Sequence, residues 1–301
     1  SAPSGTLCDT TSRATVAPTQ GSLMPFAHTA GDRARAALSH TRHEPFWLAH
    51  ADRPDPRPSL EGVARADLVI VGAGLSGLWT AVRAKQRRPD LDVILLEGGR
   101  IAGSASGRNG GFVAASITHG HLNGIERWPD EFGQLHRMGL ENLRGIEQTI
   151  EEFGIDCDYR RAGELGVVTE TYQIEHATDH VQRARAYGAE LEWWDADRTQ
   201  AEVHSPTYLG AIHDPDVGIV DPARLSWGLA RVAEELGVRI HEHSGVEALT
   251  STEVGMSLRT FGGRVEASMV ALTTAAHAPL LKRLTAFVVP VFDHVVMTAP
   301  L

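Results

Sequence analysis

The feature that most constrains the fold is the glycine-rich turn Gly72-Ala-Gly-Leu-Ser-Gly77, which stands between an apolar strand and a helix. The preceding residues 67–71 form a short β-branched run that is typical of a buried parallel strand. Apolar residues at helical spacing then predict a helix over residues 75–88, and residues 92–97 predict a second buried strand. Strand, helix and strand in this order predict a βαβ unit.

The turn also has the chemistry of a dinucleotide site. In such a turn Gly72 permits the tight bend, Gly74 lets the backbone approach a pyrophosphate, and Gly77 lets the helix pack closely on the strand. The amides at the start of the helix, around Leu75 and Ser76, then face the phosphates, and the helix dipole favours negative charge there. The alternative interpretation is a glycine turn in an ordinary α/β protein.

Glu97 ends the second predicted strand, twenty-five residues after Gly72. A carboxylate at this position can accept two hydrogen bonds from the hydroxyls of an adenosine ribose. It would also repel a 2′-phosphate, so NADP is disfavoured. The strand, the helix and the acidic residue all stand where binding of a dinucleotide requires them.

A second glycine-rich loop follows over residues 103–111. It lies just past the carboxyl end of the second strand, on the side where ligands bind in such sheets. We expect this loop to place several hydrogen-bonding groups near the same pyrophosphate: its backbone amides, the Ser106 hydroxyl, the Arg108 guanidinium and the Asn109 amide. Four glycines in nine residues also suit a flexible surface loop, which is the alternative interpretation.

Strands and helices alternate along the rest of the chain. Apolar spacing predicts helices over residues 130–153 and 174–187, and Asp221-Pro222 is a strong start for a helix that ends at Gly237. Further strands are predicted over residues 163–171, 238–243 and 265–273. The predicted fold class is therefore α/β.

Composition excludes several classes of protein. The chain has 301 residues, which corresponds to about two domains at roughly 150 residues each. Its formal charge is −10 without a basic stripe, so nucleic acid is a poor partner. No apolar run approaches the ~18–20 residues that span a bilayer, so no membrane partner is expected. The two cysteines, Cys8 and Cys157, are too few for a disulfide scaffold, and they favour a reducing, cytoplasmic location.

The fifteen histidines raise the question of a metal site. The pairs His119/His121 and His241/His243 are spaced so that each would share one face of a strand. No third ligand at a suitable spacing accompanies either pair, so no metal is predicted. His119 follows the second glycine-rich loop and is a candidate for a catalytic base, but we assign no catalytic residue.

At these residues the sequence resembles a known family, the D-amino-acid-oxidase-like FAD-dependent oxidoreductases. The resemblance rests on residues 67–77, on Leu96-Glu97 and on Ala-Ser-Gly-Arg-Asn-Gly-Gly at 105–111. Together with Phe46-Trp47 and the Pro-rich run at 53–58, it is strongest to the γ-glutamylputrescine oxidase branch, within a family that includes glycine and sarcosine oxidases. It covers residues 43–301.

The resemblance implies FAD as the cofactor, with the glycines of the turn facing the pyrophosphate and Glu97 binding the ribose. Val246 matches the position at which family members hold adenine with backbone groups. Thr273-Thr-Ala-Ala276 departs from the Ala-Thr-Asn/Gly-Ala pattern that often follows a strand in the family. The second loop contributes residues along the pyrophosphate and the flavin, namely Ser106, Arg108, Asn109, Gly110 and Gly111.

The implied architecture is a Rossmann-like FAD-binding domain with a second, smaller α+β substrate domain that is incomplete. We expect a disordered segment over residues 1–40 and a lead-in with a Pro-rich linker over residues 41–65. The FAD-binding domain is expected at residues 66–155 and 216–279, and the substrate domain at residues 156–215 and 280–301. Because the family continues past the position of Leu301, we expect a C-terminally truncated chain.

The implied reaction is oxidation of the C–N bond of an amine or amino acid, by hydride transfer to the flavin and hydrolysis of the resulting imine. The partner is then a small-molecule amine or amino acid. Two alternatives stay open. One is an NAD-dependent dehydrogenase, and the other is a truncated, non-catalytic nucleotide-binding remnant.

Overall fold

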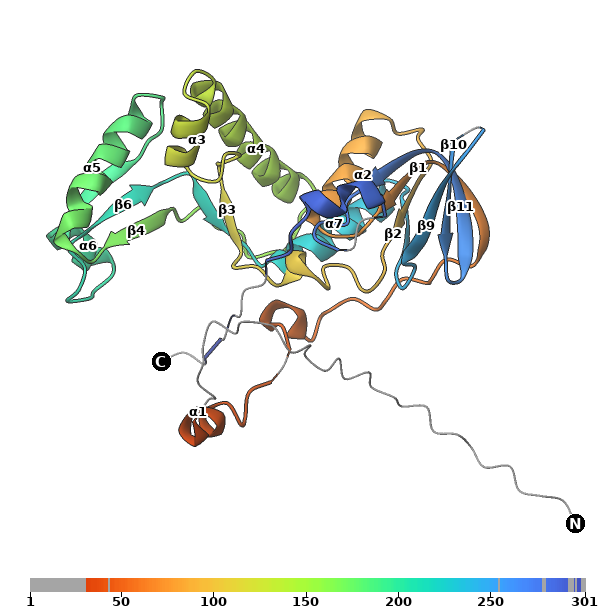
Figure 1. The fold of residues 1–301 in the computed structure, drawn as a ribbon, viewed down its shortest axis with the longest axis horizontal. Helices are drawn as coiled ribbons and strands as arrows, with labels where there is room; N and C mark the ends of the chain where they lie inside the picture. The colour runs from red at the N-terminus through yellow and green to blue at the C-terminus, as the bar shows by residue number, and fades with distance from the viewer. Residues whose placement is uncertain are drawn as a thin grey trace, which may run out of the picture. The chain divides into compact units, whose positions relative to one another are not determined.

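The computed structural model describes residues 31–42, 44–253, 255–277, 280–291, 295, 297 and 298 (Figure 1). The chain divides into two units, Ser1–His43 and Glu44–Leu301. In the first unit, residues 1–30 of the predicted disordered segment lie outside the described residues. The short helix α1 (Asp32–Ala37) differs from that prediction, because Ala and Arg favour a helix and Asp32 lies at its N-terminal end.

A six-stranded mixed sheet organises the second unit. Its parallel strands are, in spatial order, β8 (Arg239–His241), β2 (Val93–Leu96), β1 (Gly62–Val71) and β11 (Gly263–Leu272). Beyond β11 the sheet continues with two antiparallel strands, β10 (Gly255–Thr260) and β9 (Val246–Thr252). The parallel core confirms the predicted α/β class.

The predicted βαβ unit is confirmed. Helix α2 (Leu75–Arg87) connects β1 to β2, and α7 (Pro222–Glu235) packs against α2 (Figure 1). The carboxylate of Asp221 accepts hydrogen bonds from the amides of Ala223 and Arg224 at 2.9 and 3.0 Å. This cap begins α7 where the Asp-Pro pair predicts a helix start.

The core lies on both faces of the sheet, as the apolar runs of β1 and β2 predict. Ile70 of β1 and Leu95 of β2 belong to the apolar cluster that includes Leu229 of α7. Their neighbours in sequence point the other way and form a second cluster with β10 and β11 residues: Val69, Val71, Ile94, Leu96, Leu258 and Val265.

A smaller antiparallel sheet has the order β4 (Glu164–Val168), β6 (Gly210–Asp214) and β5 (Glu192–Asp195). Around it lie α3 (His121–Arg127), α4 (Phe132–Glu152), α5 (Thr171–Arg185) and α6 (Ala196–Glu202). The predicted strand over residues 163–171 ends early, at Val168. The reason is a capping box between Glu170 and Gln173, which begins α5 at Thr171.

Short elements join these parts. Strands β3 (Phe112–Ala114) and β7 (Val217–Ile219) form an antiparallel ribbon. The 3₁₀ helices η1 (Phe46–Ala49), η2 (Ala105–Gly107) and η3 (Lys282–Phe287) lie in loops. Within the described ranges, no helix has the length and apolar character that crossing a bilayer requires.

Candidate functional site

The register of the parallel strands brings four residues to one edge of the sheet. Val71 lies opposite both Leu96 and Leu272, and Leu96 also lies opposite His241. The residues that follow these strand ends are therefore neighbours, namely Gly72, Glu97, Thr273 and Glu242. Ligands of open α/β sheets bind at this carboxyl edge.

Two glycines of the first turn occupy positions that a side chain cannot. Gly72 has φ = 106°, and a Cβ there would lie 2.8 Å from the carbonyl oxygen of Thr273. A Cβ on Gly77 would lie 1.9 Å from the carbonyl oxygen of Gly72. The backbone of the turn, the start of α2 and the end of β11 are therefore packed against one another without room for a methyl group.

The second loop reaches the start of α2 through Ser106. The Ser106 hydroxyl accepts a hydrogen bond from the amide of Leu75 at 2.9 Å. A Cβ on Gly74 would lie 2.8 Å from that hydroxyl oxygen. The structure thus brings together Gly74, Leu75 and Ser106, which the sequence places in two separate motifs. Ser76 lies in the same first turn and borders a cavity of about 360 Å³ beside Thr273.

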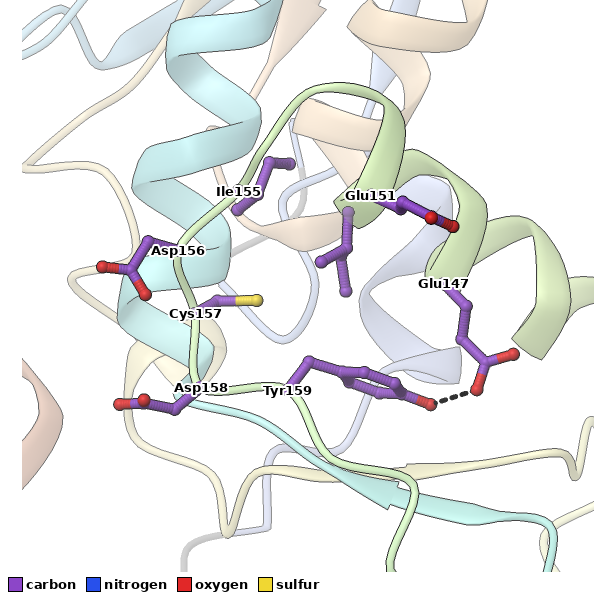
Figure 2. A pocket seen from close by; sticks show the side chains of 8 residues that line it. Glu147, Glu151, Ile155, Asp156, Cys157, Asp158 and Tyr159 are labelled. Carbon is purple, nitrogen blue, oxygen red and sulfur yellow. Dashed lines mark hydrogen bonds between the residues drawn. The ribbon is translucent and has the colours of Figure 1, made fainter.

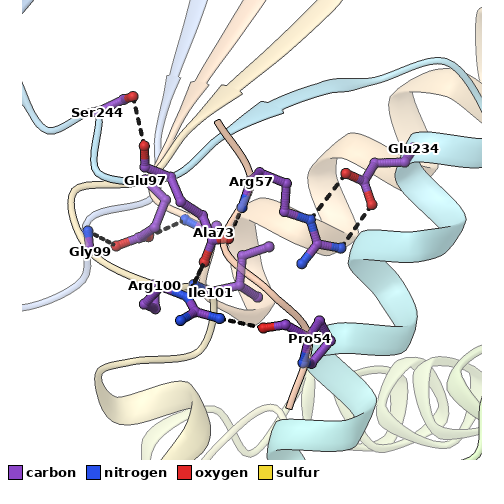
Figure 3. Close-up of polar contacts among 10 residues, drawn as sticks. Pro54, Arg57, Ala73, Glu97, Gly99, Arg100, Ile101, Glu234 and Ser244 are labelled. Carbon is purple, nitrogen blue, oxygen red and sulfur yellow. Dashed lines mark hydrogen bonds and ion pairs between the residues drawn. The ribbon is translucent and has the colours of Figure 1, made fainter. Parts of the chain in front are cut away.

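Glu97 lies beside the first turn, as predicted, and its carboxylate accepts hydrogen bonds from nearby backbone amides (Figure 3). Its Oε2 accepts a hydrogen bond from the amide of Ala73 at 2.7 Å, and its Oε1 accepts one from Gly99 at 2.8 Å. A carboxylate has about four acceptor sites, so each oxygen can accept a further hydrogen bond from a ribose hydroxyl. The arrangement fits an adenosine ribose and a pyrophosphate next to the α2 N-terminus.

The remaining residues of the second loop shape the loop itself. Asn109 donates to the carbonyls of Ala105 and Ser106 and accepts from the amide of Gly111. The exposed Arg108 donates to the carbonyl of Gly103 at 2.9 Å. Gly110 is exposed. Gly111 has φ = 79°, and its carbonyl accepts the amide of Val220 at 2.9 Å.

Val246 begins β9, at the far edge of the sheet, and lies close to the Glu97 loop through its neighbours. The amide of Ser244 donates to the Glu97 carbonyl at 2.7 Å. A Cβ on Gly98 would lie 3.5 Å from the Cα of Gly245. The segment before β9 therefore packs on the loop after β2, and the adenine-side position of Val246 stays a prediction.

The sequence does not predict the contacts of two residues in this region, Glu242 and Trp47. Glu242 is 1% exposed and accepts hydrogen bonds from the loop after β2, and Trp47 donates its indole N–H to the Asn109 carbonyl at 2.8 Å. Glu242 follows a short strand that holds only one apolar residue, Ile240, so the signal that identifies Glu97 after the apolar β2 is absent here. Trp47 and Asn109 are sixty-two residues apart in the sequence, so no local pattern predicts their contact.

The histidine pairs do not form the strand faces that their spacing suggests. His119 has φ = 58° in a turn, and His121 begins α3, so this pair shares no strand. His241 is the last residue of β8, whereas His243 lies past it with φ = 51°. In the described part of the chain, no group of three or more His, Cys, Asp or Glu residues has the arrangement to hold a metal ion.

A separate cavity of about 490 Å³ lies between the end of α4 and residues 155–159 (Figure 2). Tyr159 donates its hydroxyl to Glu147 at 2.7 Å, and burial raises the pKa of Tyr159 above its usual value. Burial also raises the pKa of the Cys157 thiol to about 11. Both groups therefore stay protonated at neutral pH, and neither is a nucleophile or a base there.

The model of the family described as FAD dependent oxidoreductase (DAO) matches residues 67–301. The chain belongs to this family. Membership decides between the two dinucleotides in favour of FAD, and the residues at the sheet edge fit its adenosine diphosphate part. The NAD-dependent dehydrogenase alternative is therefore not supported.

The relatives of the chain include an oxidoreductase and an oxidase subunit. The chain is 32% identical over 235 residues to the gamma-glutamylputrescine oxidoreductase of Escherichia coli (strain K12), a match that covers 77% of this chain and 54% of that protein. It is 26% identical over 262 residues to sarcosine oxidase subunit beta of Arthrobacter sp, covering 84% of this chain and 59% of that protein.

Solved structures share the fold of this chain. The glycine oxidase of Geobacillus kaustophilus matches with a TM-score of 0.61 and 23% sequence identity, over 71% of this chain and 56% of that chain. At this identity the likeness shows the fold. The chain spans little more than half the length of the relatives it matches.

Proposed function

We propose that this chain forms the FAD-binding part, and a portion of the substrate-binding part, of a flavoenzyme that oxidises the C–N bond of an amine or amino acid. The observation that carries the proposal is the meeting of Gly74, Glu97 and Ser106 at one edge of the parallel sheet. This edge offers a helix N-terminus for a pyrophosphate and a carboxylate for a ribose. The named activities of the two curated relatives support an amine or amino-acid substrate.

FAD, when bound, accepts a hydride from the carbon that carries the amine nitrogen. The chain's own residues hold and orient the cofactor. The N-terminus of α2, past the Leu75 amide that donates to Ser106, would bind the pyrophosphate, Glu97 would bind the ribose, and the loop braced by Asn109 would lie beside the cofactor. The oxidised substrate is an imine, and water hydrolyses it to a carbonyl compound and an amine or ammonia.

The amine must be neutral to lose a hydride, because a protonated nitrogen has no lone pair to form the C=N bond. A dry site favours this form, since desolvation lowers the pKa of an amine. We therefore assign no side chain as catalytic base. Residues 156–215 are proposed to supply part of the substrate recognition. Cytoplasmic location stays a prediction that rests on the scarcity of cysteine.

The first experiment is to purify the chain, supply FAD, remove the free cofactor and record the absorption spectrum. A retained flavin spectrum, with FAD released on denaturation, is the expected result. Incubation with candidate amines under exclusion of oxygen should then bleach the flavin bands, with ammonia or a primary amine among the products. A chain that folds but retains no flavin would overturn the proposal.

The Glu97→Leu variant tests the site itself. It removes the ribose acceptor and leaves the Ala73 and Gly99 amides without their partner, so FAD affinity should fall by about 10- to 100-fold. Glu247→Gln is the matched control, because Glu247 lies next to Val246 but forms only an exposed pair with Arg259. Equal FAD affinities for Glu97→Leu and the wild type would refute the assigned role.

A further inference from the structure

Glu242 is a buried carboxylate at the end of β8, one strand from Glu97. Its Oε1 accepts hydrogen bonds from the amide of Ile101 at 2.7 Å and from Nε of Arg100 at 3.2 Å. Its Oε2 accepts one from the amide of Arg57 at 2.6 Å. A buried charge is costly unless donors surround it, and here three donors do so.

Glu97 and Glu242 each accept a hydrogen bond from a backbone amide of the loop after β2. Glu97 binds the amide of Gly99, and Glu242 binds the amide of Ile101, two residues further on. The next residue, Ala102, has φ = 59°, a region that non-glycine residues rarely adopt and that surrounding contacts must enforce. The loop continues into η2, which places Ser106 at the start of α2.

Glu242 also fixes the segment of residues 44–60, called the lead-in segment from here on. Arg57 contributes its amide to Glu242, and its guanidinium pairs with Glu234 of α7. Arg100 donates to the Pro54 carbonyl, and the amide of Leu60 donates to the Ser244 hydroxyl at 2.8 Å. The family match begins only at residue 67, so the lead-in segment lies before it.

We propose that Glu242 is a positioning residue of the FAD site, which holds the loop after β2 in its binding conformation and fastens the lead-in segment against that loop. It acts through Ile101 and Arg100 on the placement of Ser106, not by contact with the cofactor. The inference rests on the proposed binding of FAD at this sheet edge.

The Glu242→Gln variant tests this role. The glutamine amide has one acceptor oxygen, and its NH₂ group would face donors, so one or more of the three bonds is lost. Titration of FAD with the apoprotein, followed by flavin fluorescence, should show binding about tenfold weaker or worse. In the apoprotein, hydrogen exchange at the Ile101 amide should be faster than in the wild type.

Two controls separate positioning from general loss of stability. Val265→Ala removes buried volume from β11 beside Ala64, at the end of the strand remote from Thr273, so it lowers stability without touching the site. Glu234→Gln removes the charge and one acceptor oxygen from the other contact of Arg57 and leaves Glu242 intact. Both should bind FAD within about twofold of the wild type.

Wild-type FAD affinity in Glu242→Gln, or a loss equal to that of Val265→Ala at the same loss of stability, would overturn the proposal. If Glu242→Gln does not fold, Arg100→Gln removes one donor of the carboxylate at a partly exposed position. Weaker FAD binding and faster Ile101 exchange are then expected, and unchanged values of both would overturn the proposal. Failure of the wild type to bind FAD would refute the proposed function instead, and the exchange data would still report on Glu242.

Discussion

The hydroxyl of Ser106 lies 2.9 Å from the backbone nitrogen of Leu75 and accepts its hydrogen bond, so a residue of the second glycine-rich loop caps the first turn of α2. The N-cap residue itself is Gly74, which has no side chain for this purpose. A side chain at Gly74 would displace the Ser106 hydroxyl. Gly74 leaves room for a phosphate but has no side chain to cap the helix. Ser106 accepts the helix hydrogen bond in its place.

The Ser106→Ala variant should show the value of this cap. Loss of a helix cap costs about 0.5–2 kcal/mol, so the free energy of unfolding of the apoprotein should fall within that range. Urea unfolding measures it. Ser104→Ala, which removes an exposed hydroxyl of the same loop, should change the unfolding free energy much less. Equal effects of the two variants would contradict the assignment.

The Gly77→Ala variant should be strongly destabilising and should lose FAD. The new Cβ would lie 1.9 Å from the Gly72 carbonyl oxygen, so the turn or the helix has to move. Gly145→Ala in α4 is the matched control, because its Cβ meets only the flexible Arg83 side chain at 3.6 Å. That variant should be neutral or up to about 1 kcal/mol more stable. Thermal unfolding and FAD titration of both proteins give the comparison.

Local signals in the sequence suffice for the elements around the first turn. The apolar runs of β1 and β2 and the Asp221-Pro222 helix start each depend on residues close together in the chain, and the structure has all of them. The glycine turn is local only in part: the close approach of Gly77 to Gly72 lies within the turn, whereas the atoms nearest to Gly72 belong to Thr273, about two hundred residues later in the chain.

Contacts between distant segments are what the sequence could not show. Strand β3 pairs with β7 across about a hundred residues, whereas β9 and β10 pair as a local hairpin and only the pairing of β10 with β11 joins this hairpin to the sheet. Arg108 donates through Nε to Gly103 of its own loop, a contact that the sequence does not show, and its predicted place along the cofactor stays a prediction. The role of Glu242 likewise depends on Arg57 and Ile101, far away in the chain.

Cys157 should be unreactive in the folded protein. Burial raises its pKa from 9.0 to about 11, which leaves about a hundredth of the thiolate that an unperturbed thiol has at the same pH. In a Cys8→Ser background, a thiol reagent at mildly alkaline pH should modify Cys157 slowly. Addition of urea should make the reaction fast. Rapid modification without urea would show that the thiol is accessible and refute the prediction.

Two histidines beside the smaller sheet, His121 and His180, should make the stability of the protein depend on pH. The His121 ring lies 5.5 Å from the ring of His136 and 6.0 Å from that of His180, between ring centroids. Burial lowers the pKa of both His121 and His180, although Asp214 opposes this by raising them. Below about pH 6.5 the unfolded chain therefore binds protons that the folded chain resists, so the unfolding free energy falls as the pH falls.

The His180→Gln variant tests this dependence, because it removes one of the resisting groups. Urea unfolding between about pH 8 and about pH 5.5 should show a smaller loss of stability in His180→Gln than in the wild type. His204→Gln, at an exposed position, should keep the wild-type slope. A wild-type protein that becomes more stable on acidification over this range, or a His180→Gln slope equal to that of the wild type, would show that the buried imidazoles do not control the pH dependence.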